Sequence, residues 1–265
     1  MQNNTIMIAL GGNSLSPKGS AGSVTEQFSL ARKTMNNLSE FIDLNYNICI
    51  THGNGPQVGD ELLRMDLTSD TIPPLPLGIC VANTQGQIGY MVQQTLQNEL
   101  REKSVDREVV TLVTQVIVDK DDQSINNPTK FIGPRYTKTE IDKFAAKLGW
   151  SIKEQEPGSW RRVVPSPMPE FIMHGKSIKA LVDRGTIVIA FGGGGIPVFN
   201  NKDNKIEGID AVIDKDFSAA KMGRIIRAQE LWIISDIDYL YRNFGEEDAS
   251  PIKQINSNEL RSEER

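Results

Sequence analysis

Apolar runs that lead into glycine recur along the first two thirds of the chain. Three of them read TIMIALGGN, YNICITHGNG and TIVIAFGGGG, at residues 5–13, 46–55 and 186–195. Two further apolar runs, VVTLVTQVIVD and LWIISDIDYLY, occupy residues 109–119 and 231–241. Because these runs are continuously apolar rather than alternating, they predict strands of a sheet that is covered on both faces, which is typical of parallel strands.

Helical periodicity lies between the predicted strands. Residues 24–44 place Phe28, Ala31 and Met35 near helical spacing, with Thr25 as the expected N-cap. Strands that alternate with helices predict an α/β fold with an open sheet. Ligands of such sheets bind at the carboxyl ends of the strands, which is where the glycine turns fall. Similar helical patterns occupy residues 83–104, 139–148 and 216–228.

Residues 120–170 interrupt this alternation. The stretches DKDDQSINNPTKFIGPRYT and EPGSWRRVVPSPMPE are rich in proline, glycine, charged and aromatic residues, with one helical pattern between them. We interpret the segment as an inserted subdomain or lid, although a solvated surface excursion would have the same composition. Its basic residues include Lys130, Arg135, Arg161 and Arg162.

Composition narrows the class of protein. The 265 residues carry a formal net charge of −5, which gives general nucleic-acid binding little electrostatic support. The start, MQNNTIMIALGG, lacks the basic region of a signal peptide, and no apolar run approaches the ~20 residues of a membrane span. Cys49 and Cys80 follow no metal-ligand spacing and are expected to be buried free thiols. We therefore expect a cytoplasmic protein without nucleic-acid or membrane partners.

The glycine turns suit an anionic ligand. A glycine turn between a strand and a helix exposes backbone N–H groups at a helix N-terminus, where phosphate or carboxylate binds. No glycine pair matches GxxxxGK[ST], and GNGPQVG at residues 53–59 departs from the dinucleotide fingerprint. Three such turns therefore predict an anion with several oxygens that is held outside the two familiar nucleotide loops.

The most informative polar stretch is GIDAVIDKDFSAAKMG, at residues 208–223. Its Asp214, Lys215 and Asp216 could be a helix cap with a surface ion pair, in which Asp216 is the expected N-cap. A lysine between carboxylates also suits phosphoryl transfer, because the lysine offsets charge on the moving group. His52 could act as a base or hydrogen-bond its own loop. No nucleophile elbow or zinc motif supports hydrolase chemistry.

Taken together, six segments in order resemble the carbamate kinases of the amino acid kinase superfamily. The resemblance implies an open α/β/α sandwich with a mostly parallel central sheet, with residues 120–170 protruding over the substrate site and the nucleotide-binding part starting at about residue 205. It also implies reversible phosphoryl transfer from ATP to carbamate, giving ADP and carbamoyl phosphate, with Mg²⁺ on the nucleotide phosphates. The resemblance further implies that the protein is a homodimer in the cytoplasm. It also implies that the enzyme usually runs toward ATP, during fermentation of arginine or purine derivatives. The segments are ALGGNSL, THGNGPQVG, NPTKFIGP, WRRVVPSPMP, FGGGGIPV and AVIDKD.

The resemblance also assigns roles to individual residues. Lys130, Lys215 and Asp216 would be catalytic, with Lys130 reaching down from the subdomain and Asp216 holding the lysines in place. ALGG has no lysine before its glycines, unlike relatives that phosphorylate amino acid carboxylates, so an amino acid acceptor is disfavoured. The substrate would be held by Gly11, Gly12, Asn13, Gly53, Asn54, Gly55, Gly193 and Gly194. The nucleotide would be held by Asp214, Ser235, Asp236 and Tyr241.

The resemblance weakens toward the end of the sequence. The family continues past the SDIDYLY region with a Met-Gly-Pro-Lys segment whose lysine contacts nucleotide phosphates, and this sequence contains no such segment. We expect a carbamate kinase that lacks its C-terminal part. The alternative is a shortened relative that binds carbamoyl phosphate with weak or no kinase activity.

Overall fold

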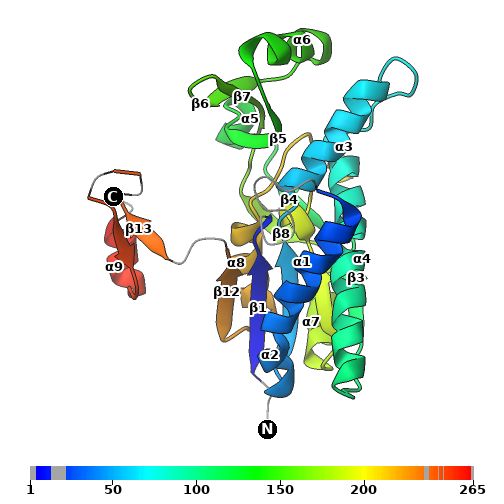
Figure 1. Cartoon of the computed structure of the whole chain (residues 1–265), viewed down its shortest axis with the longest axis vertical. Helices are drawn as coiled ribbons and strands as arrows, with labels where there is room; N and C mark the ends of the chain where they lie inside the picture. Colours follow the sequence, from blue (N-terminus) through cyan, green and yellow to red (C-terminus); the bar gives the residue numbers. More distant parts are fainter. Residues whose placement is uncertain (1–3, 13–21, 236–238, 244, 247, 264–265) are drawn as a thin grey trace. The chain divides into compact units, whose positions relative to one another are not determined.

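The chain divides into two compact units, Met1–Ile234 and Ser235–Arg265 (Figure 1). The larger unit contains every segment of the predicted α/β fold except the end of the last apolar run. The computed structural model describes residues 4–12, 22–235, 239–243, 245, 246 and 248–263.

A five-stranded sheet lies at the centre of the larger unit. All of its neighbouring strands run parallel, which confirms the prediction from the continuously apolar runs. All six residues of each of the two strands first in sequence are buried. The strand order is β12 (Glu230–Ile234), β1 (Thr5–Leu10), β2 (Asn47–His52), β9 (Ile187–Ala190) and β3 (Val109–Leu112).

Helices cover both faces of this sheet. Ile6, Ile8 and Leu10 of β1 pack with α1 (Val24–Asn37) and α4 (Leu77–Glu102), which lie side by side (Figure 1). The intervening Met7 and Ala9 pack on the other face. Because side chains of a strand alternate between faces, an unbroken apolar run serves both layers. The fold is the α/β/α sandwich with a mostly parallel sheet. The helices on the second face are α7 (Gly175–Asp183) and α8 (Lys215–Ile226).

The apolar run at residues 109–119 forms two strands rather than the single one predicted. Val113 and Thr114 separate β3 from β4 (Gln115–Val118). The N–H of Thr114 donates to Gln85 Oε1 at 2.8 Å, while its C=O accepts from Gln85 Nε2 and from the N–H of Ile196, where the other sheet begins. The second strand enters another sheet. This sheet has the order β11 (Ile206–Gly208), β10 (Ile196–Asn200), β4 and β8 (Pro169–Ile172).

The segment from 120 to 170 has a sheet of its own. After the short helix α5 (Gln123–Asn126), three antiparallel strands take the order β5, β7, β6. Tyr136, Phe144 and Trp150 contact one another beside them, with ring centroids 5.3 to 6.4 Å apart and the rings of Phe144 and Trp150 stacked. This aromatic cluster supplies a small core that a solvated surface excursion would lack. The strands are β5 (Lys130–Tyr136), β6 (Ile152–Glu156) and β7 (Ser159–Val164), and the helix is α6 (Lys138–Leu148).

Helix boundaries differ from the predictions in two places. The first helix is capped by Ser23, whose side chain accepts from the N–H of Glu26, rather than by Thr25. It ends at Asn37, and Leu38 separates it from α2 (Ser39–Asp43), so the predicted helix over 24–44 is two helices. Helix α4 begins six residues before the predicted start at 83, directly after Pro76.

The second glycine turn also begins a helix that the sequence analysis did not predict. Helix α3 (Gly55–Thr68) has Pro56 in its first turn. Proline is favoured there because its missing N–H has no partner within the helix. Pro56, directly after the glycine turn, is the signal in the sequence for this helix start.

The smaller unit contains a two-stranded antiparallel sheet, β13 (Leu240–Arg242) with β14 (Ser250–Ile252), followed by α9 (Ser257–Glu263). The apolar run at 231–241 is therefore two strands, and residues 236–238 between them lie outside the described part. Within the described residues, no helix has both the length and the apolar character needed to cross a bilayer.

Candidate active site

Three glycine turns meet at one end of the central sheet. They follow β1, β2 and β9, which are neighbours in the sheet and run parallel. The first two turns touch, since the N–H of Gly53 donates to the carbonyl of Leu10 at 2.8 Å. A Cβ atom on Gly53 would lie 2.6 Å from the backbone N of Gly12. The predicted convergence of glycine turns at the carboxyl ends of the strands is confirmed.

The four-glycine turn packs closely against protein groups. Gly192–Gly194 form a short 3₁₀ turn, and Gly193, Gly194 and Gly195 have φ angles of 68°, 88° and 101°. A Cβ atom on Gly192 would lie 2.2 Å from the His52 ring, and one on Gly194 would lie 2.5 Å from the carbonyl oxygen of Ile213. Glycine is therefore required here by left-handed backbone and by neighbouring groups of the protein itself.

A cavity of about 220 Å³ opens between these turns, the start of β5 and the start of α8. It brings together glycine backbone and two lysines, which are the kinds of group expected around a phosphoryl group. Its lining residues are Gly12, Gly53, Asn54, Gly55, Lys130, Gly193, Val212, Ile213, Asp214, Lys215 and Asp216.

Each lysine of the cavity is held by a separate aspartate. Lys130 Nζ donates to Asp214 Oδ2 at 2.6 Å, which joins the 120–170 segment to the start of α8. Lys215 Nζ donates to Asp216 Oδ1 at 2.6 Å. The prediction that Asp216 holds both lysines is therefore wrong for Lys130 in this structure.

Asp214, and not Asp216, is the N-cap of α8. Its backbone is extended, with φ −77° and ψ 126°, and its Oδ1 accepts from the N–H of Asp216 at 2.9 Å. Asp216 lies in the first turn, where a carboxylate interacts favourably with the helix dipole. The expected cap is thus displaced by two residues.

Two opposing effects act on the pKa of Asp214. Burial raises it, whereas the hydrogen bond and charge of Lys130, the N–H of Asp216 and the charge of Lys215 lower it. The result is a pKa below the usual aspartate value, so the carboxylate is ionised at neutral pH.

His52 bonds to its own loop, which was one of its two possible roles. Its Nδ1 donates to the carbonyl of Gly53 at 3.1 Å, and the residue is 1% exposed. Burial lowers the pKa of His52 to about 4, although the Gly53 bond acts in the opposite direction. The ring is therefore neutral at neutral pH and packs between two of the glycine turns.

The structure places most of the predicted site residues in or beside this cavity. Gly11 and Gly194 adjoin lining residues without lining the cavity themselves. Asn13 and Asp236 lie outside the described residues, and Ser235 and Tyr241 belong to the smaller unit. The catalytic, substrate-binding and nucleotide-binding roles of all these residues stay predictions.

Two residues of α4 that were not predicted from the sequence support the glycine turns. Thr84 and Gln85 are both at most 1% exposed. Gln85 Nε2 donates to the carbonyl of Gly192 at 2.9 Å, and Thr84 Oγ1 accepts from Asn54 Nδ2 at 2.9 Å. Their signal was available as two polar residues on the buried face of a helix, where polar groups need partners.

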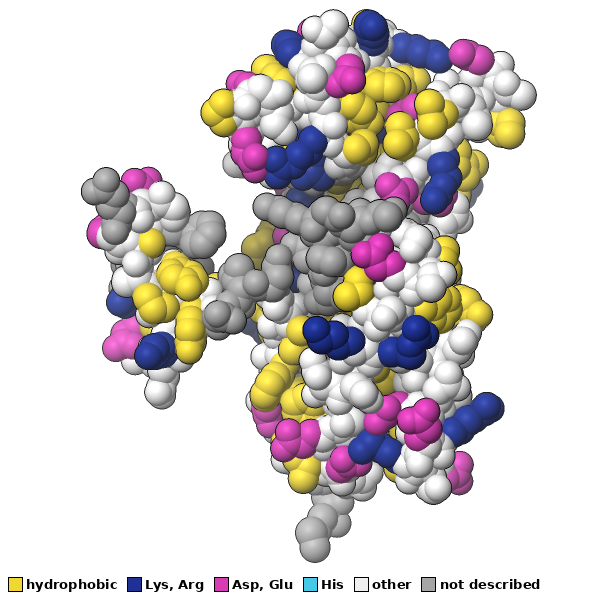
Figure 2. Space-filling model, viewed as in Figure 1, with side chains coloured by type: hydrophobic (Ala, Val, Ile, Leu, Met, Phe, Trp, Pro, Cys, Tyr) yellow, Lys and Arg dark blue, Asp and Glu magenta, His cyan; other side chains and the backbone are white. Residues whose placement is uncertain are grey.

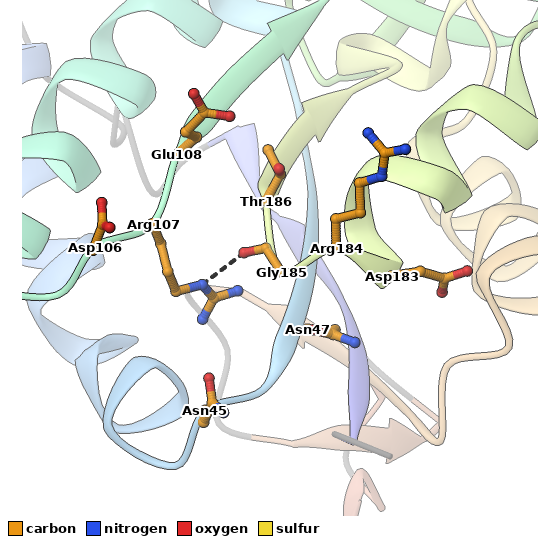
Figure 3. A pocket seen from close by; sticks show the side chains of 9 residues that line it. All are labelled: Asn45, Asn47, Asp106, Arg107, Glu108, Asp183, Arg184, Gly185 and Thr186. Atoms are coloured by element: carbon orange, nitrogen blue, oxygen red, sulfur yellow. Dashed lines mark hydrogen bonds between the residues drawn. The ribbon is translucent and has the colours of Figure 1, made fainter. Parts of the chain in front are cut away.

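A larger cavity, of about 520 Å³, lies at the opposite ends of the strands (Figure 3). It adjoins Asn47, where β2 begins, and Thr186, just before β9. There Arg107 Nε donates to the carbonyl of Gly185 at 2.7 Å. It contains none of the predicted site residues, and ligands of open α/β sheets bind at the carboxyl ends. The smaller cavity is therefore the candidate active site.

Comparisons with known proteins agree with this geometry. Residues 4–265 match the amino acid kinase family. The chain is 44% identical to a carbamate kinase of Pyrococcus furiosus over 97% of its length and 82% of the relative. It is also 44% identical to carbamate kinase 2 of Staphylococcus epidermidis, with the same coverage. The structure of a Giardia lamblia carbamate kinase bound to AMP-PNP superimposes with a TM-score of 0.88 at 34% identity, covering 99% of this chain and 83% of that one.

Proposed function

This chain belongs to the amino acid kinase family, and we propose that it is a carbamate kinase, which transfers a phosphoryl group reversibly between ATP and carbamate. The observation that carries the proposal is the cavity in which Lys130 and Lys215 face three glycine turns. The relatives at 42–44% identity are carbamate kinases, which supports the choice of carbamate as acceptor.

The cavity suits in-line transfer with no covalent step on the protein. The transferring group carries charge on its oxygens, and preorganised donors stabilise it without reorganisation. Lys215 is placed to neutralise that charge, because Asp216 holds its ammonium group while two N–H bonds stay available. Lys130 would act on the same group from the start of β5, since its bond to Asp214 holds its ammonium group beside the start of α8.

We further propose ATP and ADP as the nucleotides, with Mg²⁺ bound through their phosphates. Mg²⁺ prefers oxygen ligands and commonly keeps phosphate oxygens and waters around it. The two carboxylates of the cavity are each bonded to a lysine, so phosphate oxygens are the better ligands here. When bound, the ion supplies neutralisation of phosphate charge.

A homodimer is also proposed, through the outer face of α4. Ile79 and Tyr90 are 47% and 59% exposed, and their spacing of eleven residues puts them on one face of the helix. Val113, which follows the edge strand β3, is 58% exposed. Two copies could bury these side chains against each other. We place the enzyme in the cytoplasm, running toward ATP in arginine or purine-derivative fermentation.

The test is ATP formation from carbamoyl phosphate and ADP, with Lys215→Ala as the variant. We expect the rate to fall by about 10²–10³-fold, the effect of removing one strong transition-state donor. The fold should persist because the N-cap of α8 is Asp214. Circular dichroism would verify this.

The alternative is a relative that binds carbamoyl phosphate without turning it over. A folded wild-type chain that binds carbamoyl phosphate in calorimetry yet forms no ATP would establish that alternative and refute the kinase proposal. Exposed Lys176→Ala, on α7, is the matched control and should retain full activity.

A further inference from the structure

The side-chain amide of Asn54 is held between two elements of the active site. Asn54 follows β2, is 3% exposed and lines the 220 Å³ cavity. On one side its Nδ2 donates to Thr84 Oγ1 of α4 at 2.9 Å. On the other side, a Cβ atom on Gly193 would lie 2.2 Å from Nδ2 and 2.5 Å from Oδ1. The amide is therefore packed on Gly193 and tethered to α4.

Thr84 determines which end of this amide faces α4. A threonine hydroxyl has one hydrogen, and Thr84 donates it to the carbonyl of Val81 at 2.8 Å. Toward Asn54 the hydroxyl can then only accept, so the NH₂ group of Asn54 must face it. A turned amide would bring two acceptors together at a residue that is 0% exposed, where water cannot relieve the mismatch.

This orientation leaves an acceptor among the donors of the cavity. None of the hydrogen bonds found among the described residues uses Asn54 Oδ1, whereas Lys130 and Lys215 donate, each to the carboxylate of Asp214 or Asp216. The two carboxylates of the cavity serve to hold the lysines, and a simple anion would need only such donors. An added acceptor suits an anion that also carries N–H bonds.

We propose that Asn54, oriented by Thr84, accepts an N–H of the carbamoyl group and selects carbamoyl phosphate over acyl phosphates that lack an amino group. The inference rests on the proposed carbamate kinase function and names the residues that choose its substrate. Acetyl phosphate is the informative competitor, because its methyl group has nearly the size of the amino group and offers no N–H. Asn54 is the specificity-determining residue, and Thr84 is a positioning residue.

The experiment measures kcat/KM for ATP formation from carbamoyl phosphate and from acetyl phosphate, using the full chain with ADP and Mg²⁺. Thr84→Val keeps the side-chain shape and removes the acceptor, so the amide of Asn54 is free to turn. We expect the preference for carbamoyl phosphate to fall by about tenfold or more, as when a site loses a hydrogen bond to its substrate. The acetyl phosphate value should change by less than about threefold.

Thr84→Ser is the matched control, because it keeps the hydroxyl and should keep the preference. Asn54→Leu is a second variant in case Thr84→Val does not fold. It removes the acceptor directly and should also abolish most of the preference. A merely structural role would lower both values in proportion.

An active wild type whose preference is unchanged in Thr84→Val, or in Asn54→Leu if Thr84→Val does not fold, would overturn this inference alone. A wild type that makes ATP from neither compound would overturn the proposed function, and this inference with it.

Discussion

Asp214 has two separate tasks at the residue scale. Its Oδ1 caps α8 through the N–H of Asp216, and its Oδ2 accepts from Lys130. The first task requires only a side-chain oxygen, whereas the second benefits from a full negative charge. The two tasks can therefore be separated by substitution.

We predict that Asp214→Asn keeps the cap and weakens the hold on Lys130. Asparagine caps helices about as well as aspartate, so thermal unfolding should stay close to the wild type. The rate of ATP formation should fall by about tenfold or more, since Lys130 loses its charged partner. Asp214→Ala should lose the cap as well, at a cost of about 1 kcal/mol. Equal stability of the two variants would contradict the assignment of the cap.

The buried His52 predicts a pH dependence of stability. Its pKa is about 4 in the folded chain and near the ordinary value of 6.5 when unfolded. The unfolded state therefore binds the proton first, so the stability from neutral His52 is complete above pH 6.5 and is lost as pH falls toward 4. The full loss corresponds to about 3 kcal/mol.

The measurement compares urea unfolding of the wild type and His52→Asn from pH 7.5 to 4. Two chains must be compared because Asp66 also titrates in this range. Burial raises the pKa of Asp66 to about 6, so its contribution to stability rises as the pH falls, opposite to that of His52. The difference between the two chains isolates His52. The control is His174→Asn, at an exposed left-handed position that asparagine tolerates. A constant difference across the range would exclude the proposed linkage.

At the scale of elements, glycine decides how closely α3 approaches β5. A Cβ atom on Gly59 of α3 would lie 2.6 Å from the Cα of Gly133 in β5. Backbone therefore meets backbone where the 120–170 segment joins the sandwich, and that contact sets the position of β5, whose first residue is Lys130.

We predict that Gly59→Ala destabilises the chain although alanine is the better helix former. The propensity gain of about 1 kcal/mol is outweighed because neither backbone can move without shifting its element. Thermal unfolding should show a lower midpoint, and activity should fall with it. Gly223→Ala in α8 is the matched control, since its nearest neighbours would lie 3.8 Å away or more. An unchanged or raised midpoint in Gly59→Ala would show that α3 and β5 can separate at little cost.

On the scale of the whole molecule, the charged side chains and the exposed apolar side chains are distributed differently over the surface. Acidic and basic side chains are interspersed over the face of the larger unit seen in Figure 2. The exposed apolar side chains of α4, Ile79 and Tyr90, share one helix face, and the ring of Tyr90 also contacts Phe28 of α1. A second copy of the chain is the partner we propose for that face.

We predict that light scattering gives the wild type about twice its chain mass of 29.4 kDa. Ile79→Glu should shift the mass toward the monomer, because burying a charge against an apolar partner is costly. The helix itself should tolerate the change, since an acidic residue is favourable in its first turn. Leu67→Glu on α3, 74% exposed, is the control and should leave the mass unchanged. A wild-type monomer would contradict the proposal.

The sequence by itself determined the layered α/β fold and most of the residues that line the candidate site. Unbroken apolar runs require a sheet covered on both faces, and glycine turns after them mark the strand ends. Lys130 and Lys215 were identified from motifs because they lie in short local stretches. The division of lysines between Asp214 and Asp216 could not be found this way, because Lys130 and Asp214 are 84 residues apart.

Only the tertiary structure decided how those parts meet. It split the run at 109–119, where Gln85 takes the N–H of Thr114 and the carbonyl of Thr114 turns to Ile196 of the other sheet. It also oriented Asn54 through Thr84, thirty residues away. Local pattern reports which side chains prefer burial or a turn. It does not report which buried polar groups satisfy each other, because such partners come from distant segments and are selected only when the layers pack.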